Sequence, residues 1–342
     1  MTERNALDLL KADLKNKTPR NFYVFHGTES YLRTYYLNSL RKLLVDEFTE
    51  AFNYHRFNAE NLSLQSVLDS MDAIPMMSPT SMVQIDDVNF FSLGEDAAEY
   101  AKFFSSIPSY CTVVLVYDTV PFKIDNRKKA LAEAFSHALI VDFEQPSERE
   151  LVNWVGRHFK KHGKQITVED AQFLIRRIGG DMTTLLSEIE KISAYEQQPV
   201  VRRESIVLLV EPVLEAAVFD LSDAISAGRY ESALQCLRVL LQRQEEPISI
   251  LGVISSQMRR ILTGKQVLAE GKGSRELMSL CGISSYPAQK TLEFSRRLSG
   301  AFCEKAVELC LEADWQMKTS FDEPQRILEL LVLELAGEAA HA

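Results

Sequence analysis

Short apolar runs alternate with amphipathic stretches over the first 143 residues of the 342-residue chain. The runs at 22–25, 82–85, 112–117 and 139–143 predict β-strands. The third run, TVVLVY, is continuous and β-branched, which is typical of a parallel strand buried on both faces. Helical periodicity fills 3–16, the stretch from Gly27 to Leu44, 63–71, 95–104 and 125–135, whereas 48–57 predicts a connection with extended character. This alternation predicts right-handed βαβ units around a parallel sheet.

Beyond residue 143 the pattern is helical throughout. Ser147 and Glu150 form a capping-box pattern that begins a helix through residue 159, and Thr167 and Asp181 begin two more. Residues 144–212 therefore predict a small helical bundle. Residues 213–342 predict an all-helical domain, with helices near 219–226, 230–242, 248–268, 274–281, 287–298, 302–317 and 324–337. The chain is thus expected to divide into three domains, 1–143, 144–212 and 213–342.

Composition narrows the classes of function. The net charge of −10 argues against general coating of nucleic acid, although local basic patches can still contact phosphates. The longest apolar runs are too short to span a membrane, and the acidic start does not fit a signal peptide. The five cysteines have no C-x-x-C pairing, so we expect reduced thiols in a cytoplasmic protein, without disulfides or zinc.

A pattern close to a phosphate-binding loop follows the first predicted strand. A working loop reads G-x-x-x-x-G-K-[ST], and Gly27 to Thr34 reads G-T-E-S-Y-L-R-T. Leu32 stands where a second glycine lets the backbone approach phosphate, and Arg33 replaces the lysine. Glu29 adds a negative charge beside the position where an anion would bind. We interpret the loop as degenerate, without a nucleotide site or a cofactor.

Two groups of polar residues resemble metal ligands only in part. Asp86-Asp87 follow the predicted strand at 82–85, where carboxylates hold Mg²⁺ in ATPases. Because the phosphate cradle is degenerate, we interpret them as a cap at the end of the strand. His158 and His162 share one helix face, but no third ligand is in view. No metal site is predicted.

The segment 73–79 is apolar and interrupted by Pro75 and Pro79, so it cannot form a helix interior. It carries Met76 and Met77, two flexible side chains in a loop that cannot easily fold over them. Methionine adapts to irregular pockets and is favoured at interaction surfaces. Two interpretations follow: either the pair contacts a partner, or it plugs the end of the sheet core.

Several stretches together resemble the delta-subunit family of bacterial DNA polymerase III, within the AAA+ clamp loaders. They are YVFHGTESYL at 23–32, AFNYHRF at 51–57, Asn153-Trp154 with Gly163, IGGDMTTLLSEIEK at 178–191, VFDLSDAI at 218–225 and EADWQMKT at 312–319. Their order and spacing carry the resemblance, which runs from about residue 20 to 335. It implies an AAA+-like α/β domain with a degenerate loop, a small helical lid and an all-α C-terminal collar domain.

The resemblance also implies a function. Such a subunit binds the ring-shaped beta sliding clamp and opens it, while gamma/tau and delta-prime siblings supply the ATP-dependent steps that load it on primed DNA during replication. It is a non-catalytic part of a DNA-directed DNA polymerase holoenzyme. The family contacts the clamp through a hydrophobic pair at the place of Met76 and Met77, and Ile74 is expected to share this role. Other members carry a Leu-Phe-like pair there, so Met-Met is a departure.

The sequence leaves two points open: whether the C-terminal domain contacts DNA, and which related protein class could be a rival assignment. In the C-terminal domain Tyr286, Lys290, Arg296 and Arg297 combine an aromatic ring with cations, which suits stacking on a single-stranded base, although we favour a solvated surface or packing within the collar. The rival assignments are an active AAA+ ATPase, which needs an intact phosphate loop, and a gamma- or delta-prime-like sibling. The siblings carry a Ser-Arg-Cys motif, and the gamma-like ones zinc-type cysteine clusters, neither of which occurs in this sequence.

Overall fold

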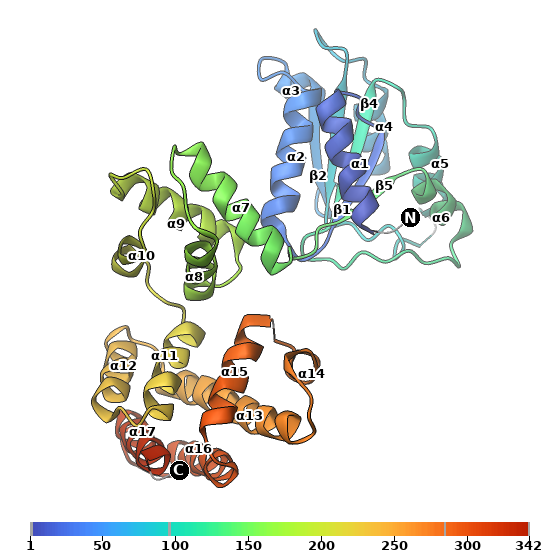
Figure 1. The fold of residues 1–342 in the computed structure, drawn as a ribbon. Helices are drawn as coiled ribbons and strands as arrows, with labels where there is room; N and C mark the ends of the chain where they lie inside the picture. Colours follow the sequence, from blue (N-terminus) through green and yellow to red (C-terminus); the bar gives the residue numbers. More distant parts are fainter. Residues whose placement is uncertain (1–2, 95–96, 284, 341–342) are drawn as a thin grey trace. The chain divides into compact units, whose positions relative to one another are not determined.

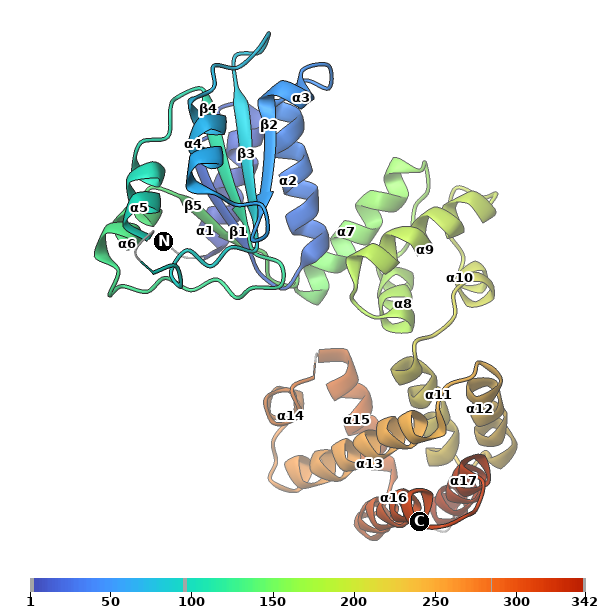
Figure 2. The same ribbon diagram turned by 180° about the vertical axis from the view of Figure 1, so that it is seen from behind.

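The computed structural model describes residues 3–94, 97–283 and 285–340, which form two compact units, Met1–Glu148 and Arg149–Ala342 (Figures 1 and 2). The first unit is an α/β domain and the second is helical. The expected fold class is therefore confirmed: an AAA+-like α/β domain with a parallel sheet, followed by an all-helical region. The division of the helical region at residue 212 stays a prediction.

A parallel sheet of five strands forms the centre of the first unit. The strands are β1 (Phe22–His26), β2 (Tyr54–Asn58), β3 (Ser81–Asp86), β4 (Cys111–Val116) and β5 (Leu139–Asp142). Their order is β2-β3-β4-β1-β5, and every neighbouring pair is parallel. The helices are α1 (Glu3–Asn16), α2 (Ser30–Leu44), α3 (Glu50–Asn53), α4 (Leu64–Asp72), α5 (Ala97–Ser105) and α6 (Lys129–Ser136).

Both faces of the sheet are covered, as the apolar runs predict. Along β1, Phe22 and Val24 point into a core shared with α4, α5 and α6, whereas Tyr23 and Phe25 point into a core shared with α1 and α2. All four side chains are buried. The alternation follows from the two-residue period of a strand, and burial on both faces is what a parallel sheet requires.

Two sequence predictions in this unit need correction. The stretch 48–57 is not a plain connection, because it holds α3 and the strand β2. β2 lies at the edge of the sheet and reads YHRFN, so it lacks the continuous apolar run of an inner strand. The helix expected from residue 125 begins at Lys129, because the Asp125 side chain accepts hydrogen bonds from the backbone and side chain of Arg127 in a turn.

The second unit contains eleven helices within the described residues. They are α7 (Glu148–Lys161), α8 (Val168–Ile178), α9 (Met182–Tyr195), α10 (Arg203–Leu209), α11 (Leu214–Ser226), α12 (Tyr230–Gln242), α13 (Pro247–Ala269), α14 (Ser274–Cys281), α15 (Ser285–Arg297), α16 (Gly300–Thr319) and α17 (Pro324–Ala340). Thr167 and Asp181 cap α8 and α9 as expected. The short α10 was not predicted. No helix of the described residues is long and apolar enough for a membrane crossing.

Glu196, which follows α9, gives the second unit a pH-dependent anchor. Its carboxylate is buried, accepts a 2.6 Å hydrogen bond from Ser205 Oγ and pairs with Arg202. The Ser205 hydroxyl, aided by Arg202, lowers the pKa of Glu196 to about 2. Because the pKa is lower in the folded than in the unfolded protein, this stabilisation is complete above the unfolded value and is lost as the pH falls toward 2.

We therefore expect Glu196→Gln to destabilise the protein at neutral pH and to differ less from the wild type as the solution is acidified. The measurement is the free energy of unfolding in urea for both proteins, from neutral pH down to about pH 3. Glu308→Gln, at an exposed i,i+3 ion pair with Lys305 on α16, serves as the control. A wild-type advantage that stayed constant across this range would contradict the role of Glu196.

Candidate functional site

The two segments singled out by the sequence lie at opposite edges of the same sheet. Gly27 follows the last residue of β1, whereas the segment 73–80 leads directly into the first residue of β3. Because all strands are parallel, their carboxyl ends lie together and their amino ends lie together. The first segment lies at the carboxyl ends of the strands (the carboxyl edge), and the second lies at their amino ends (the amino edge). A five-residue strand spans roughly 17 Å, so the two segments are separate sites.

Position 27 accepts only glycine. Its φ is +116°, a conformation that other residues rarely adopt. A Cβ built there would lie 2.4 Å from Asp142 Oδ1 and 2.5 Å from the backbone N and O of Phe143. The turn after β1 is therefore pressed against the end of β5. The tight turn expected of a phosphate-type loop is present.

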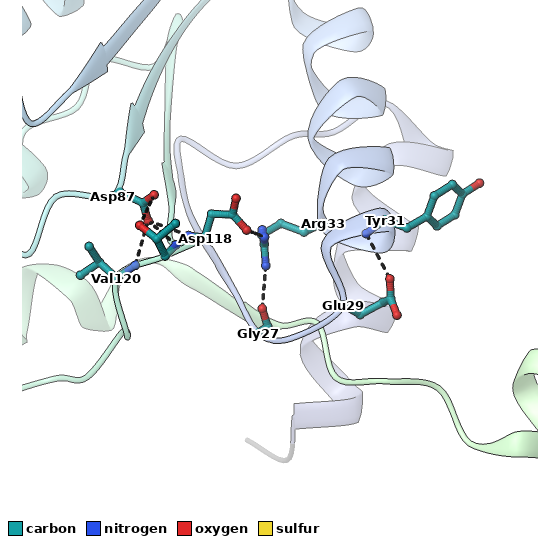
Figure 3. A network of polar contacts seen from close by, with 8 residues as sticks. Gly27, Glu29, Tyr31, Arg33, Asp87, Asp118 and Val120 are labelled. Carbon is teal, nitrogen blue, oxygen red and sulfur yellow. Dashed lines mark hydrogen bonds and ion pairs between the residues drawn. The ribbon is translucent and has the colours of Figure 1, made fainter. Parts of the chain in front are cut away.

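The chain's own side chains hold this loop together (Figure 3). Glu29 is buried and caps α2, its carboxylate accepting a 3.1 Å hydrogen bond from the backbone N–H of Tyr31. The backbone N–H of Glu29 donates to Phe143 O at 2.8 Å. The start of a helix attracts anions such as phosphate. Here a carboxylate of the chain itself stands at that position.

The Arg33 side chain folds back across the loop and is bonded to other residues of the chain. Its guanidinium donates a 2.6 Å hydrogen bond to Gly27 O and forms an ion pair with Asp118, which follows β4 (Figure 3). The Arg33 side chain is only 5% exposed. Burial lowers the pKa of the guanidinium, and the charges of Asp87 and Glu29 oppose that shift. The cation is thus already neutralised by carboxylates of the protein.

The other loop positions also lack nucleotide chemistry. Leu32 packs against the core formed with α1 and α2. Thr34, where a Mg²⁺-binding hydroxyl is expected, is exposed on α2. Together with the Arg33 contacts, this arrangement supports the interpretation of a degenerate loop.

The carboxylates of Asp86 and Asp87 are also bonded to other residues of the chain. Asp87 has a φ of +54° and accepts hydrogen bonds from the backbone N–H groups of Asp118, Thr119 and Val120. Asp86 pairs with Arg56 at 2.5 Å and accepts from Gln84. The pair caps the end of β3, as the sequence predicts, and Asp87 also holds the segment after β4, which the sequence did not predict. No cluster of three or more metal-ligating side chains occurs among the described residues.

The apolar segment at the amino edge is open to solvent. Ile74 is 84% exposed, Met76 53% and Met77 94%. These values rule out the interpretation in which the two methionines plug the sheet core. Met77 also has a φ of +54°, which is uncommon for a residue with a Cβ and costs free energy on the order of 1 kcal/mol or more.

The residues proposed to contact DNA lie on α15. The ammonium of Lys290 pairs with Glu293 at 2.7 Å, and Arg297 lies 3.5 Å from Asp223 on α11. Arg296 is exposed. The side chain of Tyr286 lies outside the described part of the structure. A contact of this helix with DNA stays a prediction.

Sequence reasoning missed two residues of these sites. Asp118 neutralises Arg33 from 85 positions away, and Asn53 makes two hydrogen bonds with Met76. A polar residue directly after the buried run 112–117 was the available signal for Asp118. A buried asparagine in a stretch assigned as a connection gave no signal, because β2 had not been recognised.

The fold and these sites together define an AAA+-like domain whose nucleotide-type loop is filled by its own side chains. A sequence model described as DNA polymerase III, delta subunit, matches residues 23–144, and one described as the C-terminal domain of that subunit matches 215–335. The chain belongs to the DNA polymerase III delta-subunit family.

Individual relatives agree along most of the chain. DNA polymerase III subunit delta of Bacillus subtilis (strain 168) is 26% identical over 329 residues, which is 94% of each protein. A probable DNA polymerase III subunit delta of Aquifex aeolicus (strain VF5) is 21% identical over 77% of this chain and 76% of its own. The solved DNA clamp loader delta protein of Bacillus subtilis superposes with a TM-score of 0.63, at 25% identity, covering 97% of this chain and 99% of that one.

The filled loop generates a direct prediction about ATP. We expect titration of Mg·ATP into the purified chain to give no heat of binding below about millimolar concentration, because the buried Arg33 is already bonded to Gly27 and Asp118 and the buried Glu29 carboxylate stands where a phosphate would bind. Isothermal titration calorimetry measures this, with titration of ATP into buffer as the control. A dissociation constant in the micromolar range would contradict the assignment and favour an active ATPase.

Proposed function

We propose that this chain is the clamp-opening subunit of the DNA polymerase III clamp loader. It binds the beta sliding clamp through Ile74, Met76 and Met77 and opens one interface of the ring. Family membership supports the loader role, and the exposure of the three side chains supports the contact. The observation that carries the proposal is the 94% exposure of Met77 on a strained backbone, at the edge of the sheet away from the nucleotide-type loop.

The energetics of the methionine pair fit a gripping contact. Each large apolar side chain contributes roughly 1.5–3 kcal/mol when it is buried from full exposure. Because Met76 is already half-buried, Met76 and Met77 together contribute at most about 3–5 kcal/mol. Their flexibility lets them fit a pocket that accepts a Leu-Phe-like pair in relatives. We propose that part of this binding free energy is used to open the ring. This requires the contact to be stronger with the open ring than with the closed ring, because a ligand shifts an equilibrium toward the state that it binds more tightly.

The other parts of the chain have supporting roles. The ATP-dependent steps belong to the gamma/tau and delta-prime siblings, which gate access of this subunit to the clamp, while this chain carries out no catalysis itself. The C-terminal helices join the siblings in the collar, and the helices after residue 144 transmit their state. Primed DNA is reached through the assembled loader in the cytoplasm.

The test is the double variant Met76→Ala with Met77→Ala. We expect its affinity for purified beta clamp to fall about a hundredfold or more, because about 3–5 kcal/mol of burial is removed. Surface-binding measurements with immobilised clamp give the dissociation constant. Folding and assembly with the sibling subunits are expected to be unchanged, since both side chains lie outside the core.

Leu280→Ala is the matched control, because Leu280 is a 60% exposed apolar residue on α14, in the other unit. It is expected to bind the clamp like the wild type. If the methionine variant binds the clamp with wild-type affinity, the proposed contact is wrong.

A further inference from the structure

The exposed apolar surface at the amino edge of the sheet is larger than the methionine pair. Phe48 is 92% exposed and Phe52 58% exposed, both in the segment that leads into β2. β2 and β3 are parallel neighbours, with Tyr54 opposite Met82. The segments preceding these two strands, which hold the phenylalanines and the methionines, therefore lie at the same end of the sheet (Figures 1 and 2).

Asn53 joins the two segments. Its side chain is fully buried and bonds to both backbone groups of Met76: the amide Nδ2 donates to Met76 O at 2.9 Å, and Oδ1 accepts from Met76 N at 2.7 Å. The contact resembles one rung of a sheet, made by a side chain. Phe52, the residue before Asn53, is thus fixed relative to Met76 and Met77.

Further contacts hold both segments rigid. The Asp46 carboxylate accepts a 2.9 Å hydrogen bond from the backbone N–H of Phe48. Arg41 of α2 forms an ion pair with Glu50 of α3. Thr80 Oγ1 donates to Leu44 O at 2.6 Å and ties the end of the methionine segment to α2. The exposed rings and thioethers are therefore displayed by an ordered support.

Exposed apolar side chains do not stabilise a monomeric protein in water, so this surface calls for another explanation. Exposed apolar side chains gathered at one end of a sheet are typical of interaction surfaces, and aromatic residues contribute disproportionately to binding. The surroundings also discriminate among partners. Asp46 and Glu47 beside Phe48 are exposed and acidic, so they repel the phosphates of a nucleic acid whose bases might stack on the rings. The chemistry favours an apolar protein surface.

We propose that Phe48 and Phe52 form a second contact region for the sliding clamp, beside Met76 and Met77. This inference rests on the proposed function, because the occupant is identified by continuity with the methionine contact through Asn53. The clamp then meets two apolar arms from neighbouring strands rather than one.

The experiment compares three variants of the full chain against purified beta clamp: Phe48→Ser with Phe52→Ser, Met76→Ala with Met77→Ala, and Tyr35→Ser. Tyr35 is the matched control, a 48% exposed aromatic residue on α2 near the opposite edge of the sheet. We expect the phenylalanine variant to weaken clamp binding at least about tenfold and the tyrosine variant to leave it unchanged. Thermal unfolding and the elution volume in gel filtration are expected to match the wild type.

Each outcome decides the matter. If the methionine variant loses affinity and the phenylalanine variant does not, the second contact region is wrong while the proposed function stands. If neither variant loses affinity, the clamp contact itself is wrong. If the phenylalanine variant changes self-association or binding of a single-stranded oligonucleotide but not clamp affinity, the rings serve another partner and the inference is overturned.

Discussion

The guanidinium of Arg33 sets the character of the first unit, because it closes the loop at the carboxyl edge of the sheet from within. It ties Gly27 to Asp118, so β1 and the segment after β4 are joined at the position where a nucleotide would join them. Asp87 secures the same segment through three backbone N–H groups. A loop stabilised in this way needs no ligand to be ordered, and the sheet it terminates is rigid whether or not ATP is present.

That rigidity matters at the other edge of the sheet. Exposed apolar side chains bind strongly only when little conformational entropy is lost on association, and a preordered support provides this. Met77 sits on a backbone conformation that persists because its surroundings hold it, with Asn53 bonded to the preceding residue. The chain thus keeps the frame of a nucleotide-binding domain and uses it to display an apolar surface.

The sequence predicted those parts of the fold that local patterns encode. The runs at 22–25 and 112–117 became buried strands because β-branched and aromatic residues filled both faces, and Thr167 and Asp181 cap helices where expected. The strand β2 was missed because an edge strand needs no apolar run. The contacts of Arg33 with Asp118 and of Asn53 with Met76 join residues far apart in the chain, and no local period reports such pairs. The sequence predicted that the loop from Gly27 to Thr34 is degenerate. It did not predict that an ion pair between Arg33 and Asp118 closes this loop.

Hydrogen–deuterium exchange of the chain, with and without saturating beta clamp, shows which segments the clamp covers. We expect the clamp to slow amide exchange in the segments 46–53 and 73–80 and to leave exchange in 27–34 unchanged, since the loop is closed by its own side chains. Protection confined to other parts of the chain, with 73–80 exchanging as fast as in the free protein, would contradict the proposed clamp contact.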